Sequence, residues 1–547
     1  MKARIEAAMV AILFAYGAGI CLFYGRIGFM SLDHSIIYDG AWRILSGQIP
    51  FRDFNTPNGI VPMILQATFF NIFGVDWFAY CLHAACVNGA FCILVYLVLK
   101  LLEVSRSLSL FYAFLSGIVF YPPLGVPFME QHAFFFVLFA IVLAVNASES
   151  ERLWVRVSSW VLVPFMCCLA YCSKQIPTLF ALPLLAYIMG AMTKRAFRKE
   201  MYVSITIAGI SLCLLLLGLF TMYELDLARF KLYFIDLPSE TGAARISHLL
   251  LMFPRSVLLI FYPALLKSVI MYSFFFIYLM GFLLLLFMKK ALAKSHGHET
   301  DASARQEAER NIAVAFSLVI ICNLFIACTM NQGENGIPYI FVSLGIVHAE
   351  WSKFMNRVAS NKQRLLKLGI TVVFIFVALF DAITFNFKVN KSRIVNDFIF
   401  TKAETTSYRL PQELKFMVFA VPGRFPKMRA DDLRKTVDYL KEKKENFLLI
   451  GDTSILYALT KKPSVNPSLW FHEGLTMPAF GTERFSLYEN ELIENMKKYN
   501  VKYIVVEGKE TFFHAKVSKF NALDRLIKER SCAVHSYGWF RLITLCR

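Results

Sequence analysis

Eleven apolar runs, each about long enough to cross a bilayer, follow one another through residues 1–386 of this 547-residue chain. A transmembrane helix needs roughly 17–25 apolar residues, because its backbone polar groups must be satisfied within the segment. Apolar residues make up 57% of the chain, which is more than soluble domains contain. We therefore expect an α-helical polytopic membrane protein with about eleven transmembrane helices. The runs lie near residues 7–24, 78–99, 108–122, 131–147, 158–172, 176–192, 201–222, 269–288, 312–330, 336–351 and 368–386.

Lysine and arginine are concentrated in alternate connections between the runs. If the N-terminus is cytoplasmic, the cytoplasmic connections contain 20 of these residues and the opposite, longer ones contain nine. Short loops rich in Lys and Arg stay in the cytoplasm, and the number of spans is odd, so residues 387–547 are expected outside it. The first run lacks a convincing cleavage site and is expected to remain as a signal anchor in the cell (inner) membrane.

Residues 387–547 show a different pattern and are expected to form an extracytoplasmic α/β domain. "ENFLLIGDTS" and "VKYIVVEG" are typical of strands, and "LYENELIENMKKYN" between them has helical spacing. The turn at Gly451 and Asp452 lacks a phosphate-loop pattern, so we favour a structural turn over a ligand site. The domain contains 28 Lys and Arg against 18 Asp and Glu, which favours anionic lipid or a phosphorylated substrate as a partner. No basic-aromatic nucleic-acid motif is present.

Ten of the twelve cysteines lie in the apolar runs, where we expect them to behave as small hydrophobic residues. The other two, Cys532 and Cys546, flank "AVHSYGWFRLITL", which alternates around Gly538 as a β-hairpin would. Outside the cytoplasm these two could form a disulfide, and the sequence leaves this open. No CxxC or HExxH spacing occurs, so no cofactor or metal site is expected, although a divalent metal also stays open.

The connection between the first two spans, residues 25–77, contains an amphipathic segment. Ile37, Ala41, Ile44 and Leu45 share one helical face, which predicts a short helix that lies on the membrane and ends at Gly47.

Ionisable residues gather in this same loop. Asp33 precedes the predicted helix and could cap its N-terminus. Asp39 and Arg43 are four residues apart and are expected to form an exposed pair, and the adjacent Arg52 and Asp53 could pair in a turn. These interpretations do not explain why so many charges gather where burial against lipid costs free energy.

The stretch "DHSIIYDGAWRILSGQIPFRDFNTPNG" resembles the first outer loop of GT-C class integral-membrane glycosyltransferases. It is similar to the bacterial branch related to protein O-mannosyltransferases and to the lipid A aminoarabinose transferase. The resemblance implies a GT-C-like catalytic domain in residues 1–386, a polyprenyl-phosphate-sugar donor, and an envelope glycan, lipid or protein as acceptor. It also implies that Asp33 is the catalytic carboxylate, followed by the turn "GQIPFRDF" with Phe51 where Tyr is common. His34 departs from the family, since many relatives have a second acid there.

Two other segments resemble this family more loosely. In "PFMEQHAFFFVLF", Glu130 and His132 occupy the place of cavity-facing polar residues, and in "AYCSKQIPTLF" a break between two short helices contains Lys174. The resemblance implies that a carboxylate takes the proton of an acceptor hydroxyl, while cations stabilise the departing phosphate and the anomeric centre inverts. For each outer-loop arginine the alternative is an anchor to lipid headgroups. The substrate-binding residues expected on this basis are Tyr38, Asp39, Arg52, Asp53, Glu130, His132, Lys174, Gln175, Arg229 and Arg245.

A secondary transporter or lipid flippase is the alternative function. Such proteins place ionisable residues at mid-span along a substrate path and are built from paired repeats. In this chain the spans are nearly free of charge and the ionisable groups cluster on one side, which favours the transferase. The sequence identifies neither the sugar nor the acceptor.

Overall fold

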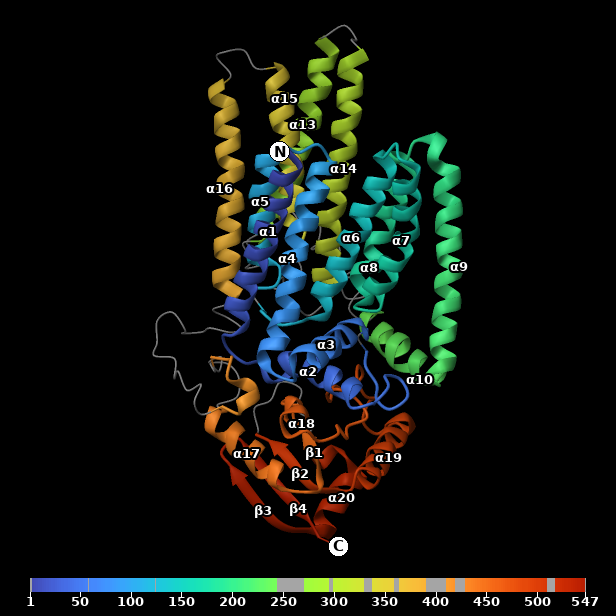
Figure 1. Ribbon diagram of the computed structural model, residues 1–547, viewed down its shortest axis with the longest axis vertical. Coiled ribbons are helices and arrows are strands. Elements are labelled where there is room, and N and C mark those ends of the chain that lie inside the picture. The colour runs from blue at the N-terminus through green and yellow to red at the C-terminus, as the bar shows by residue number, and fades with distance from the viewer. Residues whose placement is uncertain are drawn as a thin grey trace.

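The protein consists of a long helical bundle and a small sheet domain at one end of it, as the computed structural model in Figure 1 shows. The C-terminus lies at the far side of the sheet domain, and the N-terminus lies toward the opposite end of the bundle. The structure describes residues 2–57, 59–122, 124–243, 270–294, 299–328, 337–358, 364–389, 410–418, 428–508 and 517–546.

Each of the eleven apolar runs corresponds to a helix of the bundle. Within the described ranges, nine helices are long and apolar enough to cross a membrane. The helices α5 and α15 are not among them, because α5 has only 14 residues and the second half of α15 contains charged residues. The eleven are α1 (Lys2–Gly25), α4 (Trp77–Leu101), α5 (Arg106–Val119), α6 (Met129–Glu149), α7 (Leu153–Tyr171), α8 (Gln175–Tyr187), α9 (Arg198–Met222), α13 (Ile270–Lys294), α14 (Glu299–Cys328), α15 (Ile340–Val358) and α16 (Arg364–Val389).

The helices differ in how much of their surface the bundle covers. The central helices α4 and α6 are mostly buried, whereas α9 stands at the edge of the bundle and exposes leucine and isoleucine over most of its length (Figure 1). Exposed apolar side chains on a helix of this length suit contact with lipid tails. The chain is therefore a multi-pass membrane protein with a helical core around α4 and α6.

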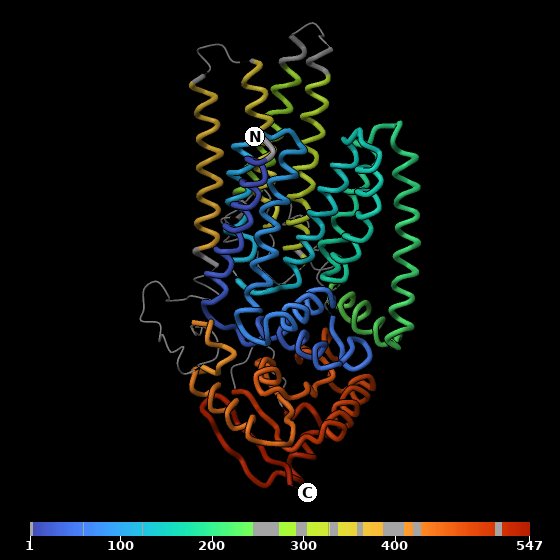
Figure 2. The backbone as a smooth tube through the Cα atoms, in the orientation of Figure 1, coloured from blue at the N-terminus to red at the C-terminus, as the bar shows by residue number. Residues whose placement is uncertain are grey.

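The described parts of the connections predicted to be cytoplasmic lie at one end of the bundle, and the described parts of those predicted to be extracytoplasmic lie at the other, as the tube in Figure 2 shows. The connections rich in Lys and Arg lie at the end far from the sheet domain. The connection between α1 and α4, and the segment after α9, lie next to that domain. Which end faces the cytoplasm stays a prediction.

The first outer loop forms two helices between the bundle and the sheet domain: α2 (Ser31–Leu45) and α3 (Val61–Phe73) (Figure 1). The predicted end of α2 is confirmed, because Gly47 follows it with a φ of +87°, a conformation that glycine adopts without strain. The prediction that Asp33 precedes the helix and caps it is wrong. The helix begins at Ser31, and Met30 is the N-cap residue, so Asp33 lies in the first turn.

The sheet domain contains four strands in the order β1-β2-β4-β3. The strands β1 (Asn446–Ile450) and β2 (Val501–Glu507) are parallel, and α19 (Glu483–Lys498) lies between them in the chain, which confirms the predicted strand–helix–strand order. The strands β3 (Ser531–Tyr537) and β4 (Phe540–Leu545) form the predicted hairpin around Gly538. The domain also contains α17 (Ala430–Glu442), α18 (Ile455–Thr460) and α20 (Asn521–Arg530).

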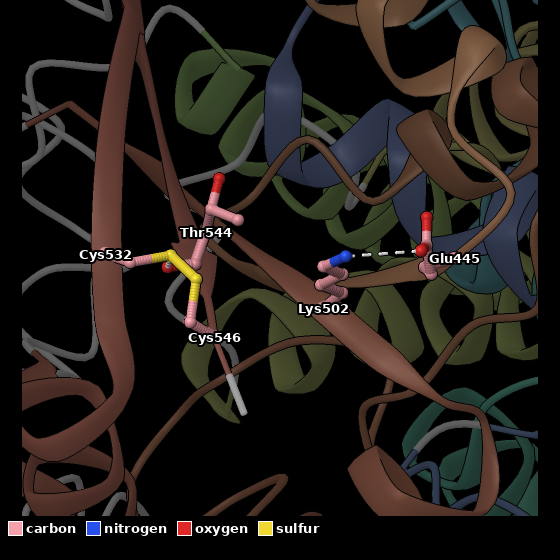
Figure 3. The surroundings of a disulfide bond; sticks show 5 residues. All are labelled: Glu445, Lys502, Cys532, Thr544 and Cys546. Carbon is pink, nitrogen blue, oxygen red and sulfur yellow. Dashed lines mark hydrogen bonds and ion pairs between the residues drawn. A yellow bond between two sulfur atoms is a disulfide. The ribbon is translucent and has the colours of Figure 1, made fainter.

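A disulfide joins Cys532 and Cys546 across this hairpin, with the two Cα atoms 5.8 Å apart (Figure 3). The structure therefore decides what the sequence left open. The other ten cysteines are free thiols.

The turn at Gly451 and Asp452 binds a side chain of the same domain. The backbone N–H groups of Asp452 and Thr453 donate to the carboxylate of Glu507, at 2.6 and 3.0 Å, and the Thr453 hydroxyl donates to it at 2.7 Å. These contacts support the structural interpretation of the turn.

Candidate functional site

Two of the residues selected from separate segments form an ion pair at the sheet end of the bundle. Glu130 lies in the first turn of α6, and Lys174 is the N-cap residue of α8, just after α7 ends. The Lys174 Nζ is 3.4 Å from Glu130 Oε1, and the two side chains are 20% and 5% exposed. The break between the two short helices thus holds a largely buried cation beside a buried acid.

The same break is in backbone contact with the first outer loop. The N–H of Gly59 donates to the carbonyl of Ser173 at 3.2 Å, and the N–H of Val61 donates to the carbonyl of Cys172 at the same distance. A Cβ at Gly59 would overlap the Cys172 carbonyl, so only glycine permits this approach. The position of Lys174 is therefore tied to the loop that contains Asp33.

Gln175 adds a side-chain link at this place. Its Nε2 donates to the carbonyl of Pro57 in the first outer loop at 3.2 Å. It also donates to the carbonyl of Phe234 at 3.0 Å, in the π-helical turn η3 (Lys231–Asp236) that follows α10 (Leu227–Phe230). Gln175 therefore joins three segments that are distant in the sequence.

Asp33 is half-buried in the first turn of α2, close enough to Tyr80 for the two groups to interact electrostatically. A negative charge in the first turn is favourable, because the N-terminal end of a helix is partially positive. Tyr38, on the same helix, is fully buried, and its ring lies 4.7 Å from that of Phe70 and 5.1 Å from that of Tyr80. These aromatic contacts hold α2 against the ends of α3 and α4.

His132 belongs to a buried hydrogen-bond network. Its Nε2 is 2.9 Å from Nε2 of His83, and its Nδ1 is 2.7 Å from the hydroxyl of Tyr121. His83 Nδ1 in turn is 3.0 Å from Gln66 Oε1. Gln66 and His83 were not predicted as site residues, although polar residues within the apolar stretches "VPMILQATFF" and "WFAYCLHAAC" were a usable signal.

The predicted turn pair of Arg52 and Asp53 is confirmed. Arg52 Nη2 is 2.9 Å from Asp53 Oδ2, which also accepts the N–H of Ile49 at 2.8 Å. Phe51 in this turn has a φ of +61°, which is uncommon for a residue other than glycine. Its ring packs 5.1 Å from that of Phe230, so tertiary contact holds this conformation.

Arg229, at the start of α10, connects the first outer loop to the sheet domain. Its Nε donates to Asn55 Oδ1 at 2.9 Å and its Nη1 donates to the carbonyl of Arg52 at 2.8 Å, while Nη2 pairs with Glu491. Its guanidinium group is thus engaged by three protein partners. Arg245 lies outside the described residues.

Asp39 and Arg43 form the predicted pair, but the expectation that this pair is exposed is wrong. Arg43 Nε is 2.9 Å from Asp39 Oδ2, and the two side chains are 1% and 0% exposed. The sheet domain covers them: Ser464 Oγ donates to Asp39 Oδ1 at 2.5 Å, and Arg43 Nη1 donates to the carbonyl of Asn466 at 2.7 Å. Burial raises the pKa of Asp39, while Arg43 and Ser464 lower it.

Among the residues that the structure describes, no group of three or more His, Cys, Asp or Glu side chains is placed to hold a metal ion.

Comparison with known proteins finds a similarity of structure but none of sequence. No known family and no curated protein matches the sequence. The crystal structure of ArnT from Cupriavidus metallidurans bound to undecaprenyl phosphate aligns with a TM-score of 0.52 at 8% identity, over 97% of both chains. The chain has the GT-C fold of ArnT. ArnT in the apo state aligns with a TM-score of 0.46 at 10% identity, over 98% of both chains.

The alignment with ArnT covers nearly the whole chain, so it includes the bundle and the sheet domain. The GT-C resemblance noted in the first outer loop is therefore confirmed for the fold. The roles of individual residues at the sheet end stay predictions.

Proposed function

We propose that this protein is a membrane glycosyltransferase that moves a sugar from a polyprenyl-phosphate donor to a cell-envelope acceptor. The observation that carries the proposal is the full-length ArnT fold, since that crystal structure contains undecaprenyl phosphate. The pair of Glu130 and Lys174 lies beside backbone contacts to the first outer loop, which also contains Asp33, and this arrangement supports the proposal, because lipid-linked phosphate and a polar acceptor meet at a membrane surface.

In this proposal Asp33 is the general base. Its carboxylate takes the proton of an acceptor hydroxyl as that oxygen bonds to the anomeric carbon. The bond from that carbon to the phosphate oxygen breaks on the opposite face, so the configuration inverts. Asp33 is half-buried in the first turn of α2, where the partially positive N-terminal end of the helix favours a negative charge.

Lys174 stabilises the departing polyprenyl phosphate. An ammonium group has three donors, so Lys174 can hold Glu130 and a phosphate oxygen together. Glu130 fixes the side chain of Lys174 in the break between α7 and α8, and Gln175 fixes the backbone there. Lys174 and Glu130 are mostly removed from water, which strengthens the electrostatic attraction of Lys174 for the departing phosphate.

We place the reaction on the extracytoplasmic face, where the charge distribution of the connections puts the first outer loop and the sheet domain. The mechanism uses no cofactor. Transfer measured with EDTA, and then with added Mg²⁺ or Mn²⁺, tests this point.

The central experiment is transfer by the purified protein in lipid nanodiscs, with undecaprenyl phosphates that carry labelled sugars and with envelope lipid and glycan fractions as acceptors. Mass spectrometry of envelope glycans from cells with and without the gene selects which sugar to test. A labelled glycan product supports the proposal. Movement of the lipid-linked sugar across liposomes without chemical change would instead support a flippase.

A further inference from the structure

The helix α2 is held on two sides by different parts of the chain. On one side Tyr38 packs against the aromatic rings at the ends of α3 and α4. On the other side, α18 and the segment after it cover the helix. Figure 1 shows α2 between the bundle and the sheet domain.

The contacts on the second side are mostly hydrogen bonds to side chains of α2 and the turn after it. Trp42 Nε1 donates to the carbonyl of Lys462 at 2.8 Å, and Gln48 Nε2 donates to the carbonyl of Ser464 at 2.9 Å. The buried pair of Asp39 and Arg43 is bonded to the same segment, at Ser464 and Asn466.

We propose that Asp39 is a positioning residue, which fixes α2 against the sheet domain and so fixes the carboxylate of Asp33. This inference rests on the proposed function for the role of Asp33. It makes the sheet domain a part of the transfer site, although Asp39 itself does not touch the reacting atoms.

The burial of the pair supports positioning over substrate binding. Each Asp39 oxygen accepts a hydrogen bond from the protein, and the side chain is fully buried. Arg43 also lies 5.1 Å from the ring centre of Phe54. Arg43 Nη2 is buried without a hydrogen-bond partner, so the pair is stabilised by the contacts of Nε, Nη1 and the two carboxylate oxygens. Two of these contacts are to Ser464 and Asn466, so loss of the sheet domain would remove them from a buried pair of charges.

The geometry of α2 explains how this affects catalysis. Asp33 and Asp39 are six residues apart on one helix, which is about 9 Å along its axis. An α-helix of this length is stiff, so if loss of the contacts at Asp39 lets α2 tilt, the carboxylate of Asp33 on the same helix is displaced as well. Displacing a reacting group by about 1 Å can reduce the rate about a hundredfold.

The experiment compares Ser464→Ala and Asp39→Asn with Glu445→Gln as a matched control. Glu445 forms a partly exposed pair with Lys502 in the same domain, 3.4 Å apart (Figure 3). We expect kcat to fall at least threefold in Ser464→Ala and at least tenfold in Asp39→Asn, with the donor KM within twofold of wild type. The control should keep the wild-type kcat.

Hydrogen exchange of the α2 amides is the second measurement, and it does not depend on turnover. Exchange should become faster over residues 35–43 in both interface variants and remain unchanged in Glu445→Gln. A wild-type kcat in Asp39→Asn, or unchanged exchange in α2, would overturn the inference. If the wild-type protein transfers no sugar, the proposed function fails, and faster exchange in the variants still shows that the sheet domain holds α2.

Discussion

Replacing Asp33 by asparagine separates catalysis from helix stability. Asp33 lies in the first turn of α2 and is not its N-cap residue, which is Met30. The change removes a negative charge from the first helical turn, which costs about 0.3–1 kcal/mol. If Asp33 is the base, turnover should fall about a hundredfold or more. That fall corresponds to about 2.7 kcal/mol in the activation free energy.

The assay measures sugar transfer and thermal unfolding on the same preparations. Asp76→Asn is the matched control, because Asp76 caps α4 at the same end of the bundle and its Oδ1 accepts the N–H of Ala79 at 2.8 Å. Asparagine keeps that acceptor, so the control should lose only a few tenths of a kcal/mol and stay active. Wild-type transfer by a well-folded Asp33→Asn protein would refute the assignment of the base.

Three other predictions follow from the described contacts. Lys174→Ala should weaken retention of undecaprenyl phosphate at least tenfold in a binding assay, whereas Lys231→Ala, which loses an exposed pair with Asp236, should bind normally. Cys532→Ser with Cys546→Ser should reduce the unfolding free energy of the sheet domain by about 3 kcal/mol, measured by denaturant titration, and an unchanged midpoint would contradict this. In an active variant without other thiols, single cysteines at Arg305 and Arg484 should react with impermeant reagents from opposite membrane faces, and labelling from one face would contradict the topology.

Local patterns predicted the helices well, because most of the apolar runs have the length that a bilayer imposes. The helix α15 was recognised from its apolar first half, but the sequence did not indicate that Glu350 in its middle is buried and accepts a hydrogen bond at 2.9 Å from Asn311 of another helix. The hairpin at Gly538 and the parallel strands were also visible, since alternation and strand length are local properties.

The sequence failed where a contact joins distant segments. Spacing alone paired Asp39 with Arg43, but it gave no sign that Ser464 would bury them. Glu130 and Lys174 were selected separately, and nothing in the sequence indicated that they form a pair. The first turn of α2 was placed too late, because Met30 offers no capping side chain to mark the beginning of the helix.

The buried contact at Asp39 has a consequence for how the protein is made. Ser464 and Asn466 follow their partners Asp39 and Arg43 by 425 and 423 residues. At ordinary rates of synthesis, roughly 20 to 85 s separate the emergence of these partners from the ribosome. During this interval Asp39 and Arg43 lack the contacts with the sheet domain that bury them, and α2 packs only against the bundle. If Asp39 positions Asp33 as proposed, we expect a nascent or truncated chain to stay inactive until the sheet domain has folded onto the first outer loop.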